Sequence, residues 1–287
     1  MLVSVYLPTK DRLELLEAAI ASVLAQTHPF VELIVVNDGS RDGTGDYLDA
    51  LACSDQRVRV IHHDQTVGAP RSRNEAIRVA HGEWITGLDD DDTFAPHRIE
   101  ALLQFALLLE KSATSYSVVF SQYHTLRGGK KTATSKRGNV GLEDIFERNQ
   151  VGNQFLARRE LFFGVGLFDE NLGAWQDLDM AMRMISARGP ARLLDAPLYN
   201  VCDEDRPDRI SRKPKAAIVE AYWRVVAKWP KATAHARRAL YLQVLGAHYD
   251  FPIEWRDVKT YVGLGVTPRS LLELARVGWR RNFRGVT

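Results

Sequence analysis

The stretch Trp84-Ile85-Thr86-Gly87-Leu88-Asp89-Asp90-Asp91-Asp92 joins an apolar segment directly to four consecutive aspartates. Short apolar segments without polar alternation are typical of strands covered on both faces of a sheet. A helix cap explains one or two of the aspartates, since Thr93 and Pro96 open the next predicted helix, but it does not explain four. Carboxylates this close repel one another unless a cation lies among them. The stretch therefore predicts a buried strand that ends in a metal or diphosphate site.

Around this stretch, strands and helices alternate over the first 125 residues. Strands are predicted at 3–7, 32–36, 57–61, 84–88 and 117–122, and helices at 13–25, 44–52, 70–80 and 96–111. This order implies an α/β fold with a mostly parallel sheet, right-handed crossovers and flanking helices. Ligands of such sheets bind beyond the carboxyl ends of the strands. The segments that follow the strands are therefore the candidate site.

These segments are rich in carboxylates. They are Pro8-Thr9-Lys10-Asp11-Arg12, Asn37-Asp38-Gly39-Ser40, His62-His63-Asp64 and the four aspartates. Oxygen ligands of this kind suit a hard cation such as Mn²⁺ or Mg²⁺, whose coordination diphosphate oxygens would complete. We expect the two histidines to be structural rather than ligands.

The strand–helix alternation ends near residue 125. At 127–131 we expect a solvated loop, with a hairpin tip as the alternative, and helices are predicted at 142–148 and 177–187. The polar, proline-bearing segment 203–208 reads as a loop. Beyond it, helices are predicted at about 215–228, 233–248 and 268–281. We therefore expect a body over residues 1–212 and a helical C-terminal extension over 213–287.

Composition narrows the class of protein. The chain has 287 residues, 45% of them hydrophobic, which suffices for a full core. Two cysteines form neither a disulfide framework nor a zinc motif. The first residues already read as a strand, so we expect no signal peptide and a cytoplasmic location. Residues 207–287 hold 16 Lys/Arg against 6 Asp/Glu, whereas 1–206 hold 22 against 30. This asymmetry indicates an anionic partner, or a tail that docks on the acidic body.

In order and spacing, these segments resemble the glycosyltransferases of family 2, which have the Rossmann-like GT-A fold. The resemblance covers about residues 1–212 and rests on 4–9 (SVYLPT), 19–27 (AIASVLAQT), 35–40 (VVNDGS), Gly68 with 73–74 (RN), 82–85 (GEWI) and 88–92 (LDDDD). It implies a nucleotide-binding part over 1–125, an acceptor-side part over 126–212, and a DXD-type metal site.

The resemblance also implies roles for single residues. Asp38 would accept a hydrogen bond from the nucleobase of the donor, and Arg73 would lie near the base or the diphosphate. Asp91 would be the principal ligand of Mn²⁺ or Mg²⁺, with Asp89 beside the ribose or the metal. The full donor-binding set is Pro8, Thr9, Lys10, Arg12, Asp38, Arg73, Asp89 and Asp90. The alternatives are a plain turn at Asp38 and a surface helix charge at Arg73.

Glycosyl transfer with inversion needs a carboxylate that takes the proton of the acceptor hydroxyl. Within 173–183, Asp177 matches the aspartate of the family's Glu-Asp pair, and Arg183 matches its downstream arginine. Asp177 is therefore the candidate base, with Asp179 as second choice and a simple helix cap as the alternative. On the acceptor side, the resemblance points to Asn153, Gln154 and Trp175, which could equally be packing or loop residues.

Two residues depart from the pattern of the family. Lys10 stands where an aromatic residue usually stacks on the base, which puts the identity of the base in doubt. Gln176 replaces the usual Glu of the pair. Members of the family often supply a further metal ligand, a histidine, from the loop after the helix that this pair begins, and the corresponding stretch of this sequence contains no histidine. In its place we expect an oxygen ligand from Asp203, Glu204 or Asp205, or a water molecule.

The end of the chain carries a predicted amphipathic helix. In 270–281, Leu271, Leu274 and Gly278 fall on one helical face, and Arg276 and Arg280 fall on another. Basic amphipathic helices with tryptophan bind anionic membrane surfaces. We expect either this contact, with the protein peripheral on the inner face of the membrane, or a helix packed on the body. Nucleic acid is the less favoured partner.

The sequence thus predicts an inverting transferase of hexosyl or N-acetylhexosaminyl groups in polysaccharide biosynthesis. The donor would be a nucleotide-diphosphate sugar, with UDP favoured, and the acceptor a hydroxyl of a glycan or lipid-linked glycan. Two alternatives remain at this point. One is a nucleotidyltransferase, although 8–12 lacks the glycine-rich loop typical of that class. The other is a sugar-nucleotide-binding scaffold without catalysis, which Lys10 and Gln176 favour.

Overall fold

A computed structural model describes residues 1–202, 213–246, 249, 251–268 and 270–275 of the chain. Contacts divide it into two compact units. The first comprises 1–141, 150–170 and 176–205, and the second comprises 142–149, 171–175 and 206–287. The predicted boundary at 212 lies outside the described residues.

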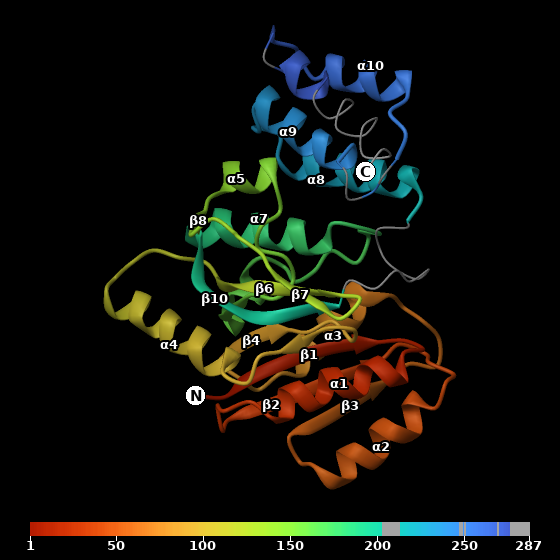
Figure 1. Ribbon diagram of the computed structural model, residues 1–287, viewed down its shortest axis with the longest axis vertical. Helices are drawn as coiled ribbons and strands as arrows, with labels where there is room; N and C mark the ends of the chain where they lie inside the picture. The colour runs from red at the N-terminus through yellow and green to blue at the C-terminus, as the bar shows by residue number, and fades with distance from the viewer. Residues whose placement is uncertain (203–212, 247–248, 250, 269, 276–287) are drawn as a thin grey trace. The chain divides into compact units, whose positions relative to one another are not determined.

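The first unit is built on one mixed, mostly parallel sheet, which confirms the predicted fold class (Figure 1). Its strand order is β3-β2-β1-β4-β9-β6-β10-β5, with β7 paired to β6 and β8 paired to β10. The strands are β1 Val3–Thr9, β2 Val31–Asn37, β3 Val58–His62, β4 Trp84–Gly87, β5 Thr93–Phe94, β6 Val119–Arg127, β7 Lys130–Ala133, β8 Asn139–Val140, β9 Leu156–Arg158 and β10 Ala191–Cys202.

The predicted β-α-β-α half has the expected parallel order. Strands β3, β2, β1 and β4 all run the same way, and β1 and β2 are buried along their whole length. Beyond β4 the sheet is no longer parallel throughout, because β9 lies antiparallel to both β4 and β6. β9 has only three residues, too few to show a period in the sequence.

Helices cover both faces of this sheet. On one face, α1 Leu13–Leu24, α2 Thr44–Ser54 and α4 Arg98–Lys111 contribute side chains to the core cluster formed with β1, β2 and β4. On the other face lie α3 Ala69–Val79 and α6 Arg159–Gly164, where the ring of Tyr6 meets those of Phe162 and Phe168 edge-on. Alternate residues of β1 therefore pack into the hydrophobic cores on the two faces of the sheet. The first unit also contains α7 Gln176–Arg188.

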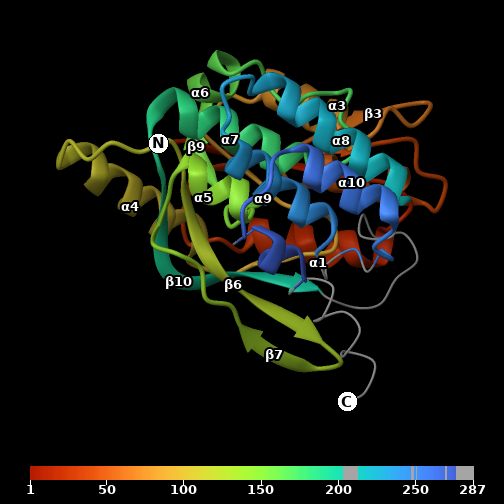
Figure 2. The same cartoon turned by 90° about the horizontal axis from the view of Figure 1, so that it is seen from above.

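The segment 127–131 is the tip of a hairpin, so the expected solvated loop is wrong and the alternative is correct. β6 and β7 pair in antiparallel fashion from His124↔Ala133 to Arg127↔Lys130, and Gly128 and Gly129 take positive φ values of 53° and 74° at the turn. Figure 2 shows this hairpin extending from the sheet.

The second unit is helical, with α5 Leu142–Glu147, α8 Lys215–Lys228, α9 Ala234–Val244 and α10 Trp255–Gly263. The predicted helices 142–148, 215–228 and 233–248 correspond to α5, α8 and α9, but α10 was not predicted. Only part of the predicted helix 268–281 is described, and residues 276–281 lie outside the described part. The rings of Tyr222 and Tyr241, 5.0 Å apart, join α8 to α9. Within the described part of the chain, no helix has the length and apolarity that crossing a membrane requires.

Candidate functional site

The parallel strands β1, β2 and β4 end next to one another, so the segments after them meet at one edge of the sheet. β1 pairs with β2 as far as Thr9↔Asn37 and with β4 as far as Tyr6↔Gly87. This brings Thr9, Asp38 and the four aspartates to the carboxyl edge, where ligands of such sheets bind.

The four aspartates alternate between inward and outward positions. Asp90 accepts hydrogen bonds from Thr9 Oγ1 (2.8 Å) and Arg12 (2.8 Å). Asp92 accepts from Tyr199 Oη (2.9 Å) and from the Cys202 amide (2.9 Å). The side chains of Asp89 and Asp91, in contrast, retain 37% and 18% exposure. The accessible carboxylates of this segment are thus those of Asp89 and Asp91.

Burial dominates the electrostatics of the two inward aspartates. It raises the pKa of Asp90 to about 6, with Asp91 adding to the rise and Arg12 opposing it. Burial also raises the pKa of Asp92, and the neighbouring carboxylates Asp91 and Asp89 raise it further. Since crowding disfavours further negative charge, a cation at this edge is favoured. Arg12 supplies one, because it also lies 3.5 Å from Asp91 Oδ2.

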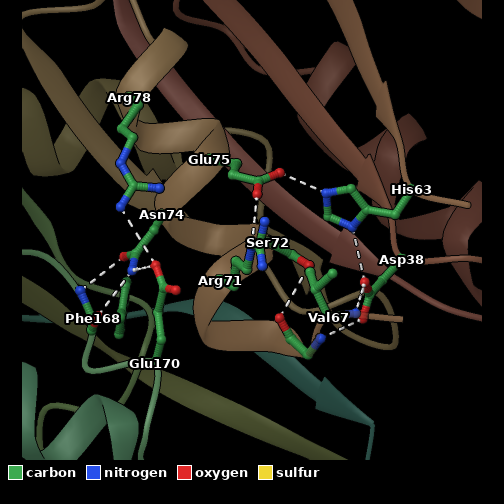
Figure 3. A network of polar contacts seen from close by, with 11 residues as sticks. Asp38, His63, Val67, Arg71, Ser72, Asn74, Glu75, Arg78, Phe168 and Glu170 are labelled. Carbon is green, nitrogen blue, oxygen red and sulfur yellow. Dashed lines mark hydrogen bonds and ion pairs between the residues drawn. The ribbon is translucent and has the colours of Figure 1, made fainter. Parts of the chain in front are cut away.

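Asp38 is the centre of a polar network, shown in Figure 3. Its Oδ1 accepts from His63 Nδ1 (2.9 Å) and the Val67 amide (2.7 Å), and its Oδ2 accepts from Thr66 Oγ1 (2.7 Å) and the Gly68 amide (2.9 Å). These four bonds fill the usual acceptor capacity of a carboxylate. Burial alone would raise the pKa of Asp38, but the bonds, with that of Val67 foremost, hold it below its ordinary value.

His63 joins this network to the helix that carries Arg73. Its Nε2 lies 2.5 Å from Glu75 Oε2 on α3, while its Nδ1 faces Asp38 (Figure 3). Burial lowers the pKa of His63, but the two carboxylates outweigh it and raise the pKa above its ordinary value. The His63 ring therefore links the middle of α3, at Glu75, to Asp38 directly after β2. These bonds are consistent with the structural role predicted for His62 and His63, which stays a prediction.

Arg73 joins the acidic segment to the start of α7. Its guanidinium is buried and donates to Asp89 Oδ1 (3.0 Å) and Gln176 Oε1 (2.8 Å). Burial lowers the pKa of Arg73, but Asp89, Tyr6 and Asp177 raise it above its ordinary value. Arg73 is thus no free surface charge, and it lies within electrostatic reach of both Asp89 and Asp177.

The neighbouring Asn74 fixes the segment that leads toward α7. Its side chain donates to the Phe168 carbonyl (2.9 Å) and to Glu170 (2.9 Å), and it accepts from the Phe168 amide (2.8 Å) (Figure 3). Arg73 and Asn74 together therefore attach α3 to both ends of the 168–176 segment.

The two candidate bases differ in their surroundings. Asp179 is fully buried and pairs with Arg183 (2.8 Å) one turn along α7. Asp177, in the first turn of α7, is only partly buried. Asp179 is thus committed to an ion pair inside the protein, which favours Asp177 for contact with a substrate.

The three predicted acceptor-side residues each have partners of their own. Asn153 donates to Asp89 Oδ1 (2.9 Å) and accepts from Tyr6 Oη (2.8 Å), so it supports the acidic segment. Gln154 accepts a hydrogen bond from Arg98 at its main-chain carbonyl. Trp175 belongs to the second unit, is 8% exposed, and donates to Tyr249 Oη (2.7 Å).

The remaining predicted donor residues lie at the end of β1. Pro8 and Thr9 are buried in the strand, whereas Lys10 is exposed. The role of Tyr6 was not predicted. A tyrosine in a buried strand signals packing, and only the structure shows that its hydroxyl reaches Asn153.

The donor set suits a metal that is shared with a substrate. Within the described ranges, no three or more His, Cys, Asp or Glu residues are grouped so as to hold a metal ion. Asp203, Glu204 and Asp205, the candidates for a further ligand, lie outside those ranges. Mg²⁺ is commonly bound through one or two carboxylates together with substrate phosphates. The partly exposed carboxylates of Asp89 and Asp91 fit that mode.

Comparison with known proteins gives the class. The sequence profile of "Glycosyl transferase family 2" matches residues 4–167, more than half of the chain. The chain belongs to this family and is a glycosyltransferase.

Its relatives are bacterial. WcaA of Escherichia coli strain K12, which carries the provisional name of a colanic acid biosynthesis glycosyl transferase, is 35% identical over 195 residues (66% of this chain, 67% of WcaA). WfgD of Escherichia coli, named as a UDP-Glc:α-D-GlcNAc-diphosphoundecaprenol β-1,3-glucosyltransferase, is 31% identical over 139 residues (47% of this chain, 52% of WfgD). The crystal structure of S. aureus TarS 1–349 with UDP-GlcNAc has the same fold. Its TM-score is 0.70 at 19% identity, over 92% of this chain and 79% of that one.

Proposed function

We propose that the chain is an inverting, metal-dependent transferase that moves a hexosyl or N-acetylhexosaminyl group in polysaccharide biosynthesis. The donor is a UDP-sugar and the acceptor is a hydroxyl of a glycan or lipid-linked glycan. The names of WfgD and TarS support this choice, because one names UDP-Glc and a diphosphoundecaprenol acceptor and the other a complex with UDP-GlcNAc.

The observation that carries the proposal is the position of Arg73. It bonds to Asp89 on the donor side and to Gln176, the residue before Asp177. A sugar held by its diphosphate near Asp89 would therefore lie close to the start of α7. Proximity of this kind is a large part of catalysis in group transfer.

In this proposal Asp177 takes the proton of the acceptor hydroxyl as its oxygen attacks the anomeric carbon. The bond from that carbon to the diphosphate oxygen breaks on the opposite face, which inverts the configuration. Arg73 and Arg12 offset negative charge around the acidic segment. Mn²⁺ or Mg²⁺ held by Asp91 and Asp89 would stabilise the departing diphosphate.

The donor proposal also assigns a role to Asp38. Since its four acceptor positions are filled by the protein, a nucleobase would share or displace one of these bonds. Its lowered pKa keeps it ionised and able to accept. Lys10, exposed beside it, can lay its stem along a base or place its ammonium on a phosphate.

The test begins with metal-dependent thermal shift against UDP-, GDP- and TDP-sugars, followed by transfer assays with the donor that binds. We expect UDP-sugars to stabilise the protein in the presence of Mn²⁺ or Mg²⁺, and Asp91→Asn to weaken this effect. Asp177→Asn should lower kcat by about 10²–10⁴-fold while donor binding persists. Glu160→Gln, which removes an exposed ion pair between α6 and Arg188 at the far end of α7, is the control. Full transfer by Asp177→Asn would refute the base, and stabilisation by another nucleotide alone would refute the donor.

A further inference from the structure

Helix α10 of the helical unit leaves two large apolar side chains exposed and buries a carboxylate. Trp255 is 71% exposed and Val262 41% exposed, whereas Asp257 and Tyr261 are buried. Positions 255, 259 and 262 lie on one side of a helix with 3.6 residues per turn. The exposed side of α10 therefore presents Trp255, Lys259 and Val262, with the exposed Arg256 at its margin.

The orientation of α10 is fixed by its buried side. Asp257 accepts from Lys215 Nζ (2.5 Å), from Tyr241 Oη (3.1 Å) and from the Glu254 amide (2.7 Å). Glu254 and Asp257 form a capping box at the first turn. Tyr261 Oη donates to the Ser270 carbonyl (3.0 Å). Because these bonds hold the polar side inward, Trp255 cannot turn inward without breaking them.

The rest of the helical unit also exposes large apolar side chains and carries an excess of positive charge. Other large apolar side chains of the unit are exposed, namely Trp223, Val266, Leu271 and Leu272. Over residues 213–287 the sequence has 14 Lys/Arg against 5 Asp/Glu. The unit therefore combines exposed apolar groups with a strong positive charge.

This combination distinguishes among the surfaces that could cover α10. The centres of protein–protein interfaces are depleted in lysine, whereas here Lys259 stands between Trp255 and Val262. Tryptophan is enriched at the membrane–water boundary, where its ring lies at headgroup level. Lysine and arginine stems reach past it to anionic headgroups.

We propose that the α10 face formed by Trp255, Arg256, Lys259 and Val262 docks the helical unit on the surface of a bilayer that contains anionic phospholipid. The face is parallel to the membrane plane, with the tryptophan ring among the headgroups and the cations on lipid phosphates. The proposal concerns binding alone, and its test needs no donor or acceptor. Its failure is therefore distinct from a failure of the proposed transfer reaction.

The test is co-flotation of the full chain with vesicles of phosphatidylcholine alone or with phosphatidylglycerol added. We expect binding only with phosphatidylglycerol, and weaker binding as salt rises. Trp255→Ser should lower vesicle affinity by about tenfold or more. The double change Arg256→Gln and Lys259→Gln should lower it roughly fivefold per charge.

Matched controls come from the first unit. Phe30→Ser removes a similarly exposed aromatic ring, and Lys130→Gln with Lys131→Gln removes two exposed cations of the β6–β7 hairpin. We expect both controls to bind like the wild type, and circular dichroism should show all variants folded.

Three results would overturn the proposal. The first is absence of binding to phosphatidylglycerol vesicles, and the second is unchanged binding by Trp255→Ser. The third is a dimer in light scattering that Trp255→Ser dissociates, since the face would then belong to a second copy of the chain.

Discussion

The bond between Arg73 and Gln176 gives the most direct test of how the site is organised. Gln176→Ala removes the acceptor of a 2.8 Å hydrogen bond from a buried guanidinium. A hydrogen bond to a charged group contributes about 1.5–3 kcal/mol. If the bond positions the start of α7 for the reaction, kcat/KM for sugar transfer should fall about 10- to 150-fold. Most of the loss should appear in kcat, because Gln176 orients rather than binds the donor.

A double-mutant cycle with Arg73→Lys isolates this bond. Lysine keeps the charge beside Asp89 but cannot span both partners, so Gln176→Ala should cost much less in the Arg73→Lys background. Gln104→Ala, on the exposed face of α4, is the control and should leave kcat/KM unchanged. The reasoning fails if the two substitutions are additive to within about 0.5 kcal/mol while the variants keep the thermal stability of the wild type.

Two further predictions concern stability. Burial lowers the pKa of His63, but its two carboxylate partners outweigh burial and raise the pKa above the ordinary value of 6.5. The stability that His63 adds to the fold is therefore complete below pH 6.5. It is lost as the pH rises through the raised pKa. His63→Gln should therefore reduce the fall of Tm as pH rises above about 6.5; an unchanged fall in His63→Gln contradicts the assignment. A Cβ at Gly87 would come within 2.4 Å of the buried Tyr6 ring, so Gly87→Ala should lower the free energy of unfolding by about 1–3 kcal/mol. Gly138 has open space around it, so Gly138→Ala should leave thermal unfolding unchanged.

The parallel half of the fold follows from local pattern. β1, β2 and β4 are short apolar segments with turn residues behind them, and the helices between them have ordinary length. In such cases the local pattern and the tertiary environment agree. In the second half of the sheet, the local sequence pattern does not identify the strands. β10 extends over twelve residues with exposed and buried positions mixed and a register shift at Pro197, so neither a period of two nor an apolar run identifies it.

The site was predictable to the level of segments rather than of contacts. The resemblance to family 2 assigned the aspartates, Arg73 and Asp177 to one predicted site, because each lies in a segment that matches the pattern of the family. The sequence could not show that Asp90 and Asp92 point inward, since four identical residues carry no signal of orientation. The same holds for Arg73, whose partner Gln176 lies 103 residues further along the chain. Pairings at that distance depend on how α3 and α7 pack, which no local pattern records.

Gln176, which stands where the family usually has a glutamate, keeps a hydrogen bond to Arg73 in the structure. A glutamate at this position would place a third carboxylate near a guanidinium that already faces Asp89 and Asp177. Glutamine accepts the same hydrogen bond without adding charge, so the positive charge of Arg73 stays available to the two aspartates. The loss of the family's glutamate thus removes a charge but keeps the link between the acidic segment and α7. We therefore infer that Gln176 is compatible with catalysis, and the double-mutant cycle measures that link directly.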